Sequence, residues 1–83
     1  MFLRNPMDTD VFNSNIPIIH LRGQNIFKIF NYKKILHYHP NEIHILLVGN
    51  ILNIKGHHLN IDYFNEDELM VRGSIQMIIF HNS

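Results

Sequence analysis

Residues 49–61, GNILNIKGHHLNI, show most clearly the pattern from which we predict the fold of this chain. Apolar residues occupy every second position in two short runs, at 52–54 and at 59–61. Side chains two residues apart in a strand lie on one face of a sheet, so each run is typical of a strand with one buried face. Gly56 stands between the runs, and we interpret it as the break between two strands.

The same alternation extends in both directions, from Ile16 to Phe80, with turn residues at most of the joints. It predicts an all-β fold, a small antiparallel β-sandwich or roll of about seven or eight short strands. Gly73 lies inside the last apolar run and indicates a bulge or bend there. The residues expected in the core are Leu47, Leu52, Ile54, Leu59, Ile61, Val71 and Ile75.

The chain has 83 residues, 46% of them hydrophobic, and a formal net charge of zero. This length fits one small domain, which we place at residues 16–83 after an irregular N-terminal arm at 1–15. A core of this size is marginal without further burial, and a neutral surface opposes contact with a second copy only weakly. No apolar stretch reaches the length of a membrane helix, so we expect no transmembrane segment.

Chemistry-bearing motifs are scarce in this chain. It has no cysteine, no glycine-rich phosphate loop and no serine in a nucleophile motif, and the acids at 66–68 fall in one turn where they are solvated. Aromatic and basic residues alternate at 27–34, but a neutral chain lacks the basic surface that binds nucleic acid. We therefore expect no enzyme, no cofactor and no nucleic-acid partner.

Histidine is the conspicuous reactive side chain, with seven in the chain. His37 and His39 would lie on one face of a strand, about 6–7 Å apart, while His57 and His58 fall at a turn. A tetrahedral zinc site needs three or four ligands, so we interpret these histidines as exposed positions and expect no metal site. The alternative is a small metal- or ligand-binding β-domain that uses these four histidines.

The last apolar run contains QMIIF, which is apolar on both faces. We predict Met77 and Ile79 in the core, and Ile78 with Phe80 on the outward face. No charged residue follows Arg72, so this strand lacks the charges that usually protect a free edge. The predicted self-association site is therefore Met77, Ile78, Ile79 and Phe80, in a homo-oligomer.

The order of the motifs resembles a known family. The segment LNIKGHHLNI at 52–61 is similar to its pattern L-x-I-x-G-x-x-L-x-I, and ELMVRGSI at 68–75, followed by Ile79 and Phe80, is similar to its ending. Further similar segments lie at 3–23, 29–36 and 42–45. On these motifs the chain resembles the YabP/YqfC family of sporulation proteins, most closely its YqfC branch.

Two positions depart from the family pattern, Phe30 in place of the usual glutamate and Lys34 in place of the usual glycine. The resemblance implies no catalytic residue. It implies a non-enzymatic sporulation protein of the mother-cell cytoplasm that acts in spore or spore-coat assembly. There it would self-associate or dock onto another sporulation protein at the forespore membrane or coat.

Overall fold

The computed structural model describes residues 16–82, which form one antiparallel sheet of six strands and contain no helix. The strands are β1 (Ile18–Arg22), β2 (Ile26–Phe30), β3 (Lys34–His39), β4 (Glu42–Leu46), β5 (Asn50–Phe64) and β6 (Glu68–Asn82). Their order across the sheet is β1-β2-β6-β5-β4-β3. The predicted all-β fold is confirmed, whereas the predicted N-terminal arm, residues 1–15, lies outside the described residues.

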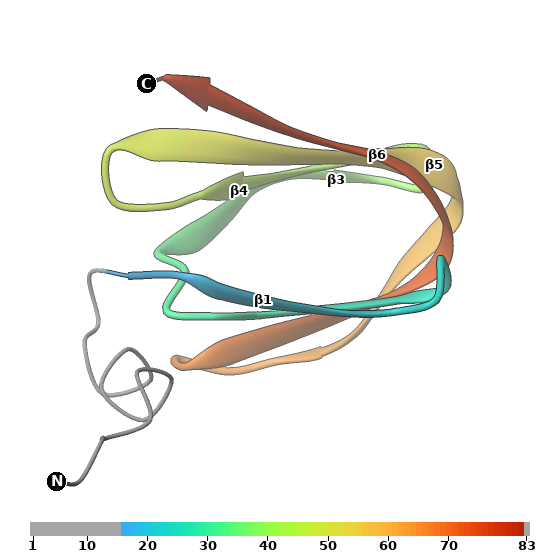
Figure 1. Cartoon of the computed structure of the whole chain (residues 1–83), viewed down its shortest axis with the longest axis horizontal. Helices are drawn as coiled ribbons and strands as arrows, with labels where there is room; N and C mark the ends of the chain where they lie inside the picture. Colours follow the sequence, from blue (N-terminus) through green and yellow to red (C-terminus); the bar gives the residue numbers. More distant parts are fainter. Residues whose placement is uncertain (1–15, 83) are drawn as a thin grey trace, which may run out of the picture.

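The two long strands, β5 and β6, fold the sheet into two layers (Figure 1). Each has 15 residues. β1, β2, the first half of β6 and the second half of β5 form the lower layer in Figure 1, while β3, β4 and the other halves form the upper layer. Because the same two strands run through both layers, the fold is a rolled sheet.

The described sheet has six strands, fewer than the roughly seven or eight that the alternation predicts. The apolar runs on either side of Gly56 both belong to β5, which stays paired with β6 along its length. A Cβ atom at Gly56 would overlap the carbonyl oxygen of Ser74 on β6. The glycine therefore does not end a strand but lets the two backbones approach closely where they bend.

The prediction of a bulge or bend at Gly73 is confirmed. Gly73 has a φ of 145°, and the register between β5 and β6 shifts opposite it, between His57 and Asn60. A second shift leaves Gln76 as an extra residue on β6. Extra residues bend a strand and increase its twist, so these two irregularities explain where the layers fold over.

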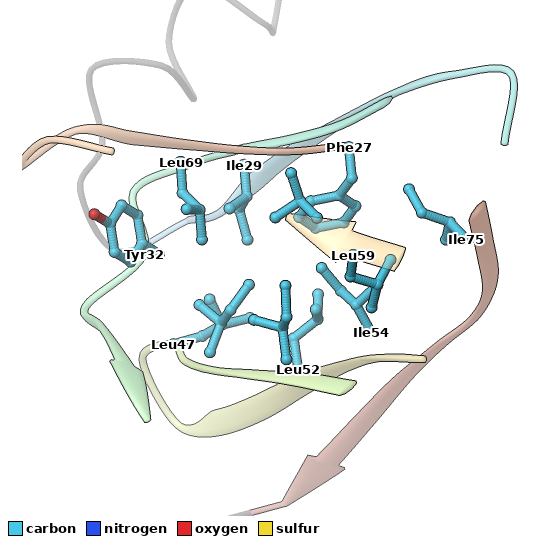
Figure 2. Close-up of a cluster of buried hydrophobic side chains, with 12 residues drawn as sticks. Phe27, Ile29, Tyr32, Leu47, Leu52, Ile54, Leu59, Leu69 and Ile75 are labelled. Carbon is cyan, nitrogen blue, oxygen red and sulfur yellow. The ribbon is translucent and has the colours of Figure 1, made fainter. Parts of the chain in front are cut away.

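Twelve buried side chains form one cluster between the layers (Figure 2). In Figure 2, Ile29 and Leu69 on one side point toward Leu47 and Leu52 on the other. The members are Phe27, Ile29, Tyr32, Ile43, Ile45, Leu47, Leu52, Ile54, Leu59, Leu69, Val71 and Ile75.

The seven residues from Leu47 to Ile75 predicted for the core are all buried except Ile61, whereas Met77, also predicted there, is exposed. Ile61 is partly buried and packs against the cluster from its rim. The reason is its place in the sheet, because the second half of β5 pairs with β6 on one side and has no other strand beyond it within residues 16–82.

Two tyrosines hold the layers together at the seam between β3 and the end of β5. The Tyr38 hydroxyl accepts a hydrogen bond from the Ile61 N–H (3.2 Å) and bonds the side-chain oxygen of Asn60 (3.1 Å). The Tyr32 hydroxyl donates to the carbonyl oxygen of Asn65 at 2.6 Å, and burial raises the pKa of Tyr32. Side-chain hydrogen bonds therefore connect the layers at this seam, where no ladder pairs β3 with β5 in the described part of the chain.

We predict that Ile54→Ala lowers the free energy of unfolding by about 2–5 kcal/mol, because it leaves a cavity at a side chain that is fully buried. Denaturant titration measures this loss. The matched control is Lys55→Ala, an exposed neighbour on the same strand, which should change stability by less than about 0.5 kcal/mol. Equal effects of the two variants would contradict the core described here.

We predict that Gly56→Ala lowers the free energy of unfolding by about 1–3 kcal/mol. The reason is that the added methyl group would collide with the backbone of β6 rather than with a side chain that can rotate away. Thermal unfolding followed by circular dichroism measures the change. An unchanged melting temperature would show that the two strands do not approach closely at Gly56.

Candidate association edge

Within residues 16–82, the C-terminal half of β6 has a neighbouring strand on one side only. β2 leaves β6 at Arg72, and the turn after β1 then accepts hydrogen bonds from the N–H groups of Gly73 (3.0 Å) and Ile75 (2.8 Å). Beyond this point β6 pairs with β5 alone, as far as residues 16–82 are concerned. We call residues 76–82 the open edge.

The open edge carries none of the charges that protect the other edges of the described sheet. β1 ends in Arg22, β3 begins with Lys34, and the free side of β5 carries Asp62. After Arg72 the sequence has no Asp, Glu, Lys or Arg. Charged side chains on an edge strand discourage pairing with another chain, so pairing is least opposed at the open edge.

The residues predicted for self-association are Met77, Ile78, Ile79 and Phe80, and all of them lie on the open edge. Their predicted faces, however, are wrong. Ile78 pairs with Ile54 and packs against the core, whereas Met77 is 53% exposed on the outward face together with Ile79. The cause is the extra residue Gln76, which shifts the alternation of side chains by one position.

A hollow of about 210 Å³, lined by both apolar and polar residues, lies between β1 and the open edge. Leu21, the turn at Gly23 and residues 75–78 line it. Leu21 and Phe80 lie on the core side of their strands, opposite the buried residues Phe27 and Leu52, yet each is 53% exposed. The core is therefore incompletely covered along this seam.

The four histidines considered as metal ligands lie in two places in the described chain. His37 lies beside His44 on β4, with 5.0 Å between ring centroids, and 6.4 Å from the ring of His39. His44 Nε2 lies 2.8 Å from Glu42 Oε2, and this hydrogen bond lowers the pKa of the Glu42 carboxyl group. His44 is thus a neighbour that the H-x-H spacing did not predict, because it comes from the next strand.

His57 and His58 lie instead at the bend of β5, where both are exposed and His58 has a φ of 55°. Within residues 16–82, no group of three or more His, Cys, Asp or Glu side chains could hold a metal ion. The alternative of a histidine metal site therefore gains no support from the described geometry.

A larger hollow, of about 590 Å³, lies at the seam that the tyrosines hold. Its lining includes Tyr32, Phe64 and the side chains of Lys33, Lys34 and Glu66. Both lysines and the glutamate are exposed, and the Tyr32 hydroxyl is already bonded to a backbone carbonyl. This hollow gives no basis for assigning an active site.

Together, residues 16–82 define a rolled all-β sheet in which one strand edge lacks protecting charges. The chain belongs to the YabP family, whose sequence model matches residues 14–83. No curated protein and no solved structure matches it. Membership of the YabP family suggests a sporulation-related protein, and this family is not known as a family of enzymes. Within residues 16–82, no helix is long and apolar enough to cross a membrane.

We predict that removing metal ions leaves the folding of this protein unchanged. The melting temperature should be the same with and without a chelator, and added zinc should not raise it, because no described cluster supplies enough ligands. Two double variants serve as controls. One combines His37→Ala with His44→Ala, and the other combines His57→Ala with His58→Ala. A drop of several degrees on chelation that disappears in either double variant would contradict this prediction and identify the ligands.

Proposed function

We propose that this chain is a non-enzymatic sporulation protein, most similar to the YqfC branch of its family, that acts in assembly of the spore or spore coat. It acts in the mother-cell cytoplasm at the forespore surface, by self-association or by docking onto another sporulation protein. The observation that carries the proposal is the match of the YabP family to residues 14–83.

The open edge supports an assembly role. An assembly protein needs a surface that joins chains together, and an unpaired strand provides a row of backbone donors and acceptors for that purpose. The open edge has such a row, has no Asp, Glu, Lys or Arg, and borders the hollow that Leu21 and Ile78 line. The site consists of Met77, Ile78, Ile79 and Phe80, with Met77 and Ile79 reaching outward and the other two reaching toward the seam.

The test is deletion of this chain's coding sequence in its native spore-former. We expect a lower yield of heat-resistant spores and an altered coat in thin-section electron microscopy, both restored by the wild-type sequence supplied in trans. A fluorescent fusion should gather at the forespore surface on the mother-cell side. Normal yield and a normal coat in the deletion strain would overturn the proposal.

A further inference from the structure

The backbone of the open edge is oriented for pairing with another strand. The N–H of Leu47 donates to the carbonyl oxygen of Asn50 (2.9 Å). At the start of β5, the N–H and C=O groups of the even-numbered residues therefore point toward β4. The odd-numbered Asn53 therefore points toward β6, where it pairs with Ile79. By the alternation of an antiparallel ladder, the N–H and C=O groups of Ile78 and Phe80 point away from β5, to the open side.

The open edge is also complementary to a copy of itself. Residues 76–82 have Ile79 at their centre, so two copies in antiparallel orientation pair along their full length when Ile79 faces Ile79. This register places Ile78 opposite Phe80 and Met77 opposite His81. The edge contains no Asp, Glu, Lys or Arg, so no two such charges of like sign face each other in this register.

The same register covers the exposed part of the seam. Ile78 lines the hollow between β1 and the open edge, and Phe80 of the second copy would lie directly opposite it. Phe80 and Leu21, each 53% exposed, are the apolar side chains on the core side that this contact would shield from water. Apolar burial is the favourable contribution that backbone hydrogen bonds alone do not supply.

We propose that two copies of this chain pair through their open edges, antiparallel and with Ile79 opposite Ile79. The product is a closed dimer in which the upper layers of both copies form one continuous sheet. This inference rests on the proposed function, since it names a second copy as the partner of the open edge. A contact of one strand and one seam is small, so the dimer is expected to dissociate on dilution.

A cysteine placed at the symmetry axis tests the register directly. The natural chain has no cysteine, so any disulfide must form at the introduced residue. In the proposed dimer the two Ile79 residues form a non-hydrogen-bonded pair, with Cα atoms about 4.5 Å apart, which is within the range that a disulfide bridges. Ile79→Cys should therefore form a covalent dimer under mild oxidation. The matched control is Val48→Cys, 46% exposed in the turn before β5, which should remain largely monomeric.

A mixed experiment distinguishes this register from unspecific contact. Met77→Cys alone should cross-link poorly, since each copy of residue 77 faces residue 81. A mixture of Met77→Cys and His81→Cys should give the cross-linked mixed dimer. Equal cross-linking of Ile79→Cys and Val48→Cys, or of Met77→Cys alone and in the mixture, would overturn the proposed register.

Charge variants test the edge without a covalent bond. Ile79→Lys and Ile79→Glu each place like charges directly opposite each other, and each should weaken the dimer at least about tenfold in sedimentation velocity. Mixing the two variants should restore association, because opposite charges then meet. Circular dichroism checks that both variants keep the β signal, and the corresponding variant Val48→Lys should leave the dimer unchanged.

A wild-type protein that stays monomeric at hundreds of micromolar overturns this inference, as does a charge mixture that fails to associate while both variants are folded. Such results leave the deletion phenotype untouched, so the proposed function would survive them. A dimer with the predicted cross-links in a strain whose deletion has normal spores would instead overturn the proposed function alone.

Discussion

The close approach of β5 and β6 at their common bend is the constraint on which the rest of the structure depends. Both strands must turn from the lower to the upper layer while staying paired, and Gly56 and Gly73 lie where a Cβ atom would meet the backbone of the neighbouring strand. The bend brings the apolar faces of the two layers together and creates the buried cluster between them. Without it, the described strands would form an open sheet with one face exposed to water.

The bend also explains why the two seams of the roll differ. β3 and the end of β5 are close enough for Tyr38 and Tyr32 to make hydrogen bonds between the layers. β1 is short, and beyond Ile75 the described chain offers no strand to pair with β6 on that side. The C-terminal half of β6 is therefore exposed as an edge although β6 occupies a central position in the strand order. β6 is thus paired on both sides in the lower layer and is an edge strand in the upper layer, within residues 16–82.

The arrangement of ionisable and apolar side chains supports the proposed assembly role. The ionisable side chains of the described chain are spread over strand faces and turns, and the close group around His44 consists of histidines beside one glutamate. The apolar side chains that remain exposed near the open edge, by contrast, adjoin unpaired backbone groups. Membership of the YabP family suggests a sporulation-related protein, and the open edge supports the proposal that its role there is assembly.

Much of this protein is determined by the sequence alone, because alternation with a period of two is a local property that each strand carries by itself. It predicted the all-β fold and the buried positions of Leu52 and Ile54 on β5, and the sequence itself shows that no Asp, Glu, Lys or Arg follows Arg72. Only the tertiary structure decided which elements are continuous and which edge is open. Whether Gly56 ends a strand depends on the approach of Ser74 on β6, and the faces of Met77 and Ile78 depend on the extra residue at Gln76. A bulge is set by the register with a neighbouring strand, and an open edge by the order of all the strands, so neither could be predicted from any one segment.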